Sequence, residues 1–156
     1  MPDRTTKQIT REIEPLRVDD TIVVANRRVI ESELPALPVV DADGRFAGIF
    51  GEREFIAAIF PGYVGELASA RMVSRTLDAT IKRRESCRAE QVGEYMTTDH
   101  VVVEDDYSDT QLAETFLHHR VLVIPIATEG KVHAVVTRHD FFELLAAKLD
   151  ERPEDR

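Results

Sequence analysis

Hydrophobic and polar positions follow one order twice along the chain, in residues 19–56 and 106–142. Each segment runs from a polar start into a helix-like stretch and then a short apolar run around a proline. A glycine-containing turn and a second apolar run follow, leading into another helix. Short apolar runs bounded by turn residues favour strands, and Asp-Gly suits a hairpin because it tolerates positive φ. Each segment is therefore predicted to fold as helix, strand, tight turn, strand and helix.

The two segments are in the same register. As many positions separate Thr21 from Pro38 as separate Ser108 from Pro125. Both hydroxyl residues suit a helix N-cap, where the side chain accepts a hydrogen bond from an unpaired backbone amide. A sheet as small as each segment can form needs a cover for its apolar face, and a second copy can supply it. The pattern therefore predicts an internal duplication.

A long stretch separates the two copies. The predicted boundaries are a first repeat at 1–60, a helical connector at 61–95, a second repeat at 96–149 and a flexible tail at 150–156. Proline and glycine end the helix that begins at Glu52. Residues 68–84 then have the composition of a helix, with Met72, Leu77 and Ile81 as its apolar positions. We expect a connector that is longer than a simple linker.

The amino-acid composition limits the class of protein and its cellular compartment. The chain has 156 residues, of which 43% are apolar, enough for one compact domain or two small halves that share a core. No apolar run reaches the roughly 18 to 20 residues that span a bilayer, and the polar N-terminus lacks the features of a signal peptide. A single cysteine, Cys87, excludes an internal disulfide. We therefore expect a cytoplasmic protein with no membrane contact.

Charge argues against nucleic acid as a partner. The formal net charge is -9, whereas nucleic-acid binding needs a basic surface. Residues 71–90 are a local exception, with six basic residues against three acidic ones. This small excess is expected to be a solvated helix face.

The histidines and the cysteine have no partner residues at the spacings typical of a metal site or a catalytic site. His118 and His119 are adjacent, so on a helix they diverge by about 100° and do not share a metal ion. His133 and His139 flank a strand–helix corner with no cysteine or second acid spaced for zinc. Cys87 is expected to be an exposed thiol rather than a nucleophile. We therefore expect no metal site, no required cofactor and no enzymatic activity.

The two copies together resemble a pair of cystathionine-beta-synthase (CBS) domains, also called a Bateman module. The stretches that carry the resemblance are Leu37–Asp41, Asp43–Gly44, Gly48–Ile49 and Val135–Asp140. The resemblance covers roughly residues 9–149. It implies an α+β fold, in which two small β-sheets pack with helices in a pseudo-twofold arrangement and leave two clefts between the repeats.

The resemblance also implies a role. CBS pairs are typically regulatory sensors that bind adenosine compounds such as AMP, ADP, ATP or S-adenosylmethionine and modulate a partner. They commonly associate in twos, and the apolar residues in 53–60 and 140–149 fit a homodimer because they would otherwise form an exposed patch. The regulated protein is not identified. A pair with degenerate clefts, acting only in protein interaction or dimerisation, is the alternative.

The resemblance places a ligand site at the start of the last helix. Thr137 matches the hydroxyl position that meets phosphate and Asp140 the carboxylate that accepts from ribose, with Arg138 and His139 between them. A helix N-terminus attracts anions, and a carboxylate is an acceptor matched to two sugar donors. Helix capping by Thr137 and Asp140 is the other interpretation, and both can hold. The residues expected at the base are Ile13, Glu14, Leu34 and Ala36.

The first repeat departs from the family pattern. Gly51 stands at the hydroxyl position and Glu54 at the acidic position, and Val101 is assigned to the same cleft. Leu122 and Val123 stand where family members that hold phosphates carry cations, which argues against ligands with several phosphates. We therefore expect the cleft of Gly51 and Glu54 to be weak or empty.

Overall fold

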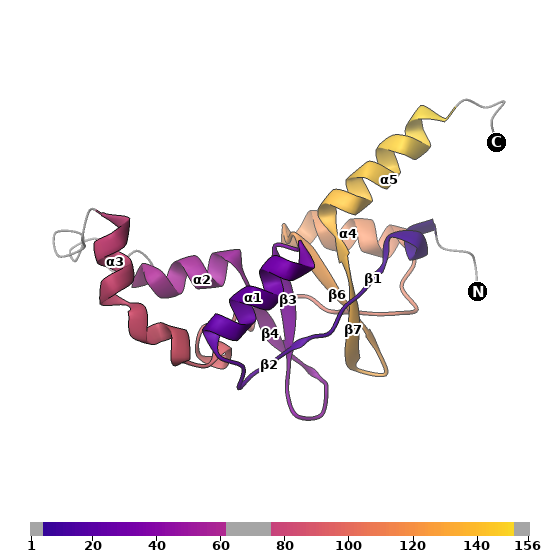
Figure 1. The fold of residues 1–156 in the computed structure, drawn as a ribbon. Coiled ribbons are helices and arrows are strands. Elements are labelled where there is room, and N and C mark those ends of the chain that lie inside the picture. The colour runs from indigo at the N-terminus through magenta and orange to yellow at the C-terminus, as the bar shows by residue number, and fades with distance from the viewer. Residues whose placement is uncertain (1–4, 62–75, 152–156) are drawn as a thin grey trace. The chain divides into compact units, whose positions relative to one another are not determined.

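The computed structural model describes residues 5–61 and 76–151 (Figure 1). The α-helices are α1 (Ile22–Ser32), α2 (Glu52–Ile59), α3 (Leu77–Arg83), α4 (Asp109–His119) and α5 (Arg138–Asp150). The 3-10 helices include η1 (Thr5–Ile9), η4 (Glu85–Ala89) and η5 (Val92–Glu94). The strands are β1 (Arg11–Glu12), β2 (Leu16–Arg17), β3 (Ala36–Val40), β4 (Phe46–Gly51), β5 (Val103–Glu104), β6 (Val123–Thr128) and β7 (Lys131–Thr137). Helices with two small sheets confirm the predicted α+β fold.

The chain divides into two compact units that do not follow sequence order. The first unit combines Met1–Pro15, Asp43–Phe46 and Val101–Arg156, and the second combines Leu16–Ala42 and Ala47–His100. The N-terminal segment therefore belongs with the second repeat rather than with the first. Within the described ranges, no helix has both the length and the apolar character needed to cross a bilayer.

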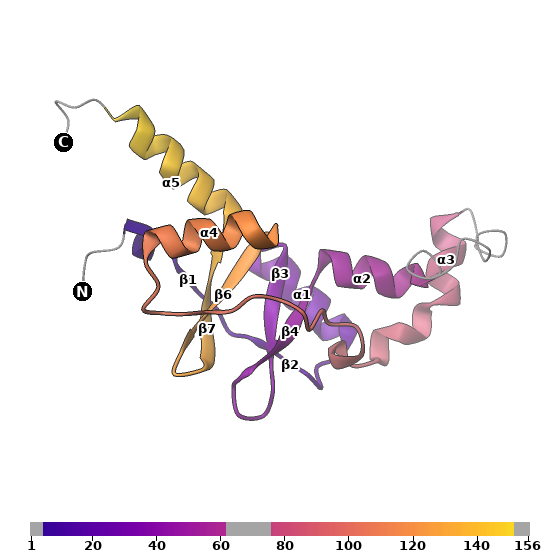
Figure 2. The same ribbon diagram turned by 180° about the vertical axis from the view of Figure 1, so that it is seen from behind.

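The first unit is built on a four-stranded sheet in the order β1-β7-β6-β5 (Figures 1 and 2). Strands β6 and β7 form an antiparallel hairpin, and its turn places Glu129 and Gly130 at φ of 52° and 81°. The glycine suits this turn because it enters the left-handed region without a Cβ penalty. Strand β1 is antiparallel to β7, while β5 is parallel to β6.

Helices α4 and α5 supply the apolar cover of this sheet. Phe116 of α4 and Phe141 of α5 stack with ring centroids 5.5 Å apart. They pack in one buried cluster with Ile124, Ala134 and Val136 of the hairpin. Burial of such side chains contributes roughly 1.5 to 3 kcal/mol each, so this cluster holds both helices on the sheet. The start of α5 is thereby fixed relative to the end of β7.

The second unit has a three-stranded sheet in the order β2-β3-β4, with β2 parallel to β3. An antiparallel bridge joins Ile49 of β4 to Thr97, and the two residues exchange backbone hydrogen bonds of 2.8 and 2.9 Å. In each unit, then, the second strand of the hairpin pairs with a segment from the start of the other repeat. Arg11 pairs with Val135 in the first unit as Thr97 pairs with Ile49 in the second.

The predicted helix N-caps are confirmed. Thr21 accepts from the amide of Val24 at 3.4 Å, and Ser108 accepts from the amide of Gln111 at 3.1 Å. Both caps have extended backbone, as an N-cap requires. The equal spacing of these hydroxyls in the sequence therefore reflects equivalent helix starts.

The described part of the connector contains α3, η4 and η5. α3 has seven residues, and its apolar side chains Leu77 and Ile81 are exposed. Met72 lies outside the described residues. The basic stretch is not a uniformly solvated helix face, because Arg84 is half-buried. Its guanidinium donates to the carbonyl of Ala58 at 2.9 Å and to the hydroxyl of Tyr95 at 3.0 Å. Arg84 therefore ties the connector to the end of α2.

The prediction that Cys87 is exposed is wrong. The residue lies in η4 with 3% of its surface accessible, and this burial raises the pKa of its thiol. The charge of Arg84 lowers the pKa of the thiol by less than desolvation raises it. Cys87 therefore acts as a small apolar side chain in the second unit.

Gly51 ends β4 where two backbone segments nearly touch. A Cβ on this residue would lie 2.2 Å from the carbonyl oxygen of Pro35 and 2.4 Å from the Cα of Ala36. The next amide, that of Glu52, donates to the same Pro35 oxygen at 3.0 Å. Since backbone atoms form the contact, no rotamer change of a neighbour can make room. Only glycine fits at this position.

Replacing Gly51 should therefore destabilise the fold. We expect Gly51→Ala to lower the free energy of unfolding by about 1 to 3 kcal/mol or more, because the added methyl forces a backbone shift. Thr137→Ala, at the equivalent position of the other repeat, should cost only about 1 kcal/mol through the lost helix cap. Urea unfolding of both variants measures the difference. A Gly51→Ala variant as stable as the wild type would contradict the close approach.

Candidate functional site

The end of β7 and the start of α5 form a polar corner in the first unit. Thr137 is the last residue of β7 and the N-cap of α5, and its buried hydroxyl oxygen accepts from the amide of Asp140 at 3.0 Å. The capping interpretation of Thr137 is thus confirmed. The amide of Arg138 donates to the carbonyl of Leu122 at 2.9 Å. Two of the first three amides of α5 are therefore already paired.

Asp140 accepts two hydrogen bonds from Arg11. Nε of Arg11 lies 2.7 Å from Oδ2 and Nη2 lies 3.0 Å from Oδ1, so one guanidinium engages both carboxylate oxygens. These bonds hold the pKa of Asp140 below its ordinary value, against the smaller opposing effect of burial. Charge and shape match well in a two-bond arginine–carboxylate pair. The carboxylate is therefore ionised at neutral pH.

Sequence reasoning missed Arg11. No local pattern marks it, since its approach to Asp140 depends on the pairing of β1 with β7, which puts Arg11 opposite Val135. The neighbouring residues Ile13 and Glu14 were singled out from the family resemblance instead. A family resemblance indicates which positions bind a ligand in other members. It does not show which further side chains lie beside those positions in this protein.

The predicted base-contacting residues are divided between the two units. Ile13 is half-buried, with its amide on the carbonyl of His133 at 3.0 Å, and Glu14 beside it is exposed. Both belong to the first unit, together with Thr137. Leu34, which is buried, and Ala36, which begins β3, belong to the second unit. Their contact with a base stays a prediction.

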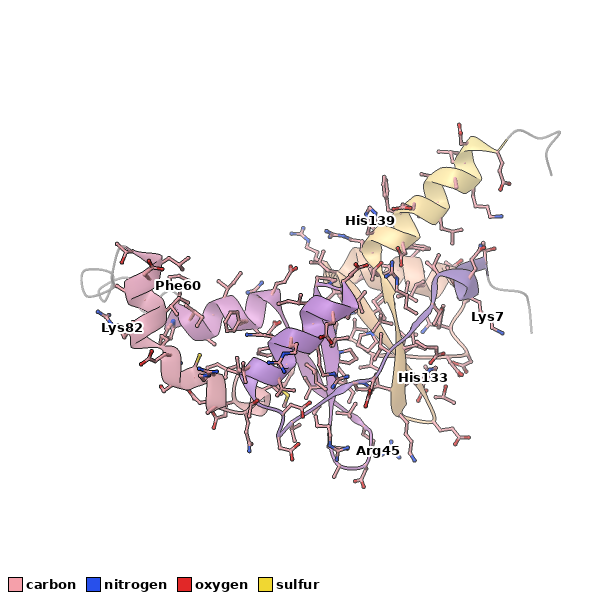
Figure 3. All side chains as sticks on the ribbon, viewed as in Figure 1. Lys7, Arg45, Phe60, Lys82, His133 and His139 are labelled. Carbon is pink, nitrogen blue, oxygen red and sulfur yellow. The ribbon has the colours of Figure 1, made fainter. Side chains whose placement is uncertain are left out.

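The two side chains between the hydroxyl and the acid are at the surface. Arg138 is exposed. His139 lies at the start of α5 (Figure 3), and its imidazole pairs with Glu143 one turn later. The charge of His139 helps to lower the pKa of Asp140, by less than the hydrogen bonds from Arg11. The part of these cations in ligand binding stays a prediction.

The acidic residue of the first repeat is closed off by its own unit. Glu54 is 8% exposed, and its Oε1 accepts from the amide of Gly51 at 3.0 Å while Oε2 accepts from the hydroxyl of Thr97 at 2.7 Å. Gly51 has no side chain to return a capping bond. Val101, assigned to the same cleft, is partly buried against the apolar cluster of the first unit. The expectation that this cleft is weak stays a prediction.

The two acids are held in equivalent ways. Arg11 reaches Asp140 from the strand position opposite Val135, and Thr97 reaches Glu54 from the position opposite Ile49. The difference lies in charge and exposure. Glu54 is buried with a neutral hydroxyl and an amide, whereas Asp140 has 17% of its side chain exposed and is paired with a cation that is 46% exposed. Of the two, Asp140 is the acid that a solute can reach.

Within residues 5–61 and 76–151, no group of three or more His, Cys, Asp or Glu side chains is arranged to hold a metal ion. His118 and His119 end α4 and are exposed. His133 instead joins a chain of hydrogen bonds, with Nδ1 3.1 Å from Glu12 and Nε2 2.7 Å from the hydroxyl of Thr128. This histidine therefore helps to hold β1 against β7.

Comparison with known proteins agrees with this architecture. A CBS domain-containing protein of Dictyostelium discoideum is 25% identical over 146 residues, which cover 93% of this chain and 92% of the relative. The CBS domain of a membrane protein from Sphaerobacter thermophilus superposes with a TM-score of 0.69 at 22% identity, over 90% of this chain and 86% of that one. The structure of CBSX2 in complex with AMP superposes with a TM-score of 0.66 at 17% identity, over 96% and 100%.

The sequence model of the CBS domain matches twice, at residues 7–61 and 92–147, which together make up most of the chain. The two matched ranges correspond to the two copies of the helix–strand–turn–strand–helix pattern. This protein therefore belongs to the CBS domain family and carries two CBS domains in tandem.

Proposed function

We propose that this CBS pair is a regulatory sensor that binds an adenosine-type ligand at the β7–α5 corner. The carrying observation is the ionised, partly exposed carboxylate of Asp140 in the first turn of α5. An ionised carboxylate only accepts hydrogen bonds, and a ribose offers two neighbouring hydroxyl donors. The guanidinium of Arg11 donates to both carboxylate oxygens, which shows that two neighbouring donors can reach them together.

The anionic end of the ligand is proposed to lie at the first turn of α5. Free amides and the positive end of the helix dipole favour an anion there. Because the amides of Arg138 and Asp140 are paired within the protein, the amide of His139 and the hydroxyl of Thr137 are the donors we assign to a phosphate. Leu122 brings no cation. A nucleoside or monophosphate fits these few donors better than ATP.

The fold similarity to CBSX2, whose structure contains AMP, supports the ligand class at the level of the fold. A second candidate is a pair that acts only in protein interaction. The closed state of Glu54 and the absence of a hydroxyl at Gly51 favour it for the first repeat. The two candidates differ in whether Asp140 has a ligand.

A thermal-shift panel tests the ligand. We expect AMP or adenosine to raise the melting temperature of the wild type, and a ligand at 100 times its Kd adds about 2.7 kcal/mol of stability. ADP, ATP, NAD and S-adenosylmethionine complete the panel. Asp140→Ala should weaken binding by about 1 to 3 kcal/mol through lost charged hydrogen bonds. Glu143→Ala, an exposed acid one turn away, is the matched control.

No shift with any of these compounds would favour the interaction-only role. A shift that survives unchanged in Asp140→Ala would place the ligand elsewhere on the chain.

The ionised state of Asp140 can be tested through stability. Its folded-state pKa is lowered, so the stabilisation is complete above the unfolded value of about 3.9 and is lost as the pH falls through the folded value. The difference in stability between the wild type and Asp140→Asn in urea unfolding should therefore be largest near pH 6. It should shrink as the pH falls below about 4 and vanish only below the folded-state pKa. In an Arg11→Ala background the pH-dependent part should shrink. A difference independent of pH would contradict the charged pair.

We also propose that the chain forms a homodimer through α5. This helix extends away from its sheet, and Phe141 is its one buried residue (Figure 1). Phe142, Leu145 and Leu149 lie along one side with exposed fractions of 63%, 52% and 87%. Their spacing of three and four residues makes a continuous apolar stripe, which favours a covering partner in water.

Sedimentation at micromolar concentration tests the homodimer. We expect a dimer for the wild type and a shift towards monomer for Leu145→Glu, because a charge in an apolar interface is costly to desolvate. Ala147→Glu places the same charge on the opposite side of α5 and should remain dimeric. A monomeric wild type, or equal dissociation of both variants, would count against this interface.

A further inference from the structure

Strand β1 brings a cation to the acid that the proposed ligand needs. Arg11 lies opposite Val135 and extends to Asp140, where its Nε and Nη2 engage the two carboxylate oxygens at 2.7 and 3.0 Å. A guanidinium and a carboxylate in this geometry satisfy each other's charge and hydrogen-bonding directions. The ribose acceptor is therefore already occupied by a side chain of the same unit.

The equivalent contact in the second unit shows what is specific to this pair. Thr97 donates to Glu54 at 2.7 Å from the matching strand position, and that acid is buried and also bound to the amide of Gly51. A ligand would have to desolvate and break a closed network there. Arg11 and Asp140 are both partly exposed, so solvent and salt can compete for their contact. Only the first unit has an exchangeable contact at this position.

The guanidinium fork lies on the side of Asp140 from which donors reach both oxygens together, so a ribose diol that donates to both oxygens competes with it for that side. We propose that Arg11 is an internal competitor of the ligand, which must displace the guanidinium from Asp140 in order to bind. This inference rests on the proposed function, since it concerns the same carboxylate. It makes Arg11 a regulator of affinity, and it couples occupancy of the site to the side chain of β1.

Displacement of Arg11 does not require β1 to leave the sheet. Glu12, the next residue, contacts His133 at 3.1 Å, and the amide of Ile13 donates to the carbonyl of His133 at 3.0 Å. Further towards the N-terminus, the carboxylate of Asp109 accepts from the amides of Thr5 and Thr6 at 3.0 and 3.1 Å. The strand therefore stays anchored while the arginine side chain rotates away from Asp140.

Adenosine is the probe that isolates this competition, because it is neutral and carries the ribose diol. In isothermal titration calorimetry, Arg11→Ala should bind adenosine about three- to tenfold more tightly than the wild type, since the ligand no longer breaks a charged pair. Raising NaCl from 50 to 500 mM should strengthen adenosine binding to the wild type, because salt weakens the pair. The affinity of Arg11→Ala should not change with salt.

Matched variants distinguish a failure of the proposed competition from a failure of the proposed ligand site. Glu12→Gln weakens the contact of β1 with His133 but leaves Asp140 paired with Arg11. The adenosine affinity of this variant should therefore equal that of the wild type. Binding by Arg11→Ala alone, with none by the wild type, would also support the competition. Equal adenosine binding by the wild type and Arg11→Ala, lost in Asp140→Ala, would overturn the competition and keep the site.

AMP, titrated in parallel, identifies another role for the arginine. Weaker AMP binding by Arg11→Ala at unchanged adenosine affinity would assign Arg11 to the phosphate and overturn the competition. No binding of adenosine or AMP to the wild type or to Arg11→Ala would overturn the proposed function and the competition together.

Discussion

The exchange of edge strands is the constraint on which the rest of this structure depends. β1 lies at the start of the first repeat but pairs with β7 of the second, and Thr97 lies at the start of the second repeat but pairs with β4 of the first. Backbone hydrogen bonds along a sheet edge satisfy groups that would otherwise be unpaired. Each unit is therefore complete only when it includes a segment from a distant part of the chain, which explains why the units do not follow sequence order.

This exchange also sets the chemistry of the two acidic positions. The residue that pairs beside the hairpin reaches the first turn of the next helix, so its side chain decides what the acid contacts. A threonine there gives Glu54 a neutral, buried network. An arginine there gives Asp140 a charged partner near solvent and keeps it ionised. Two repeats with one fold thus acquire different properties through a single residue outside each repeated pattern.

Backbone proximity reinforces the difference. At the end of β4, Pro35 and Ala36 leave room only for Gly51, whereas β7 ends in Thr137, which caps α5 with its hydroxyl. The corner at Thr137 therefore keeps polar groups that the corner at Gly51 lacks. This asymmetry supports the proposal of one ligand site per chain. The stripe of Phe142 and Leu149 on α5 is a separate feature, suited to association between copies.

The sequence by itself determined the duplicated pattern, the N-caps at Thr21 and Ser108, and the capping hydroxyl of Thr137, because these depend on residues close together in the chain. It could not determine the burial of Cys87 or the partner of Asp140. Both depend on segments distant in sequence, and one step of register in β1 would turn Arg11 to the other face of the sheet. Only the tertiary structure decided which side chain binds the carboxylate of Asp140, because pairing across the sheet, not local sequence, brings Arg11 to Asp140.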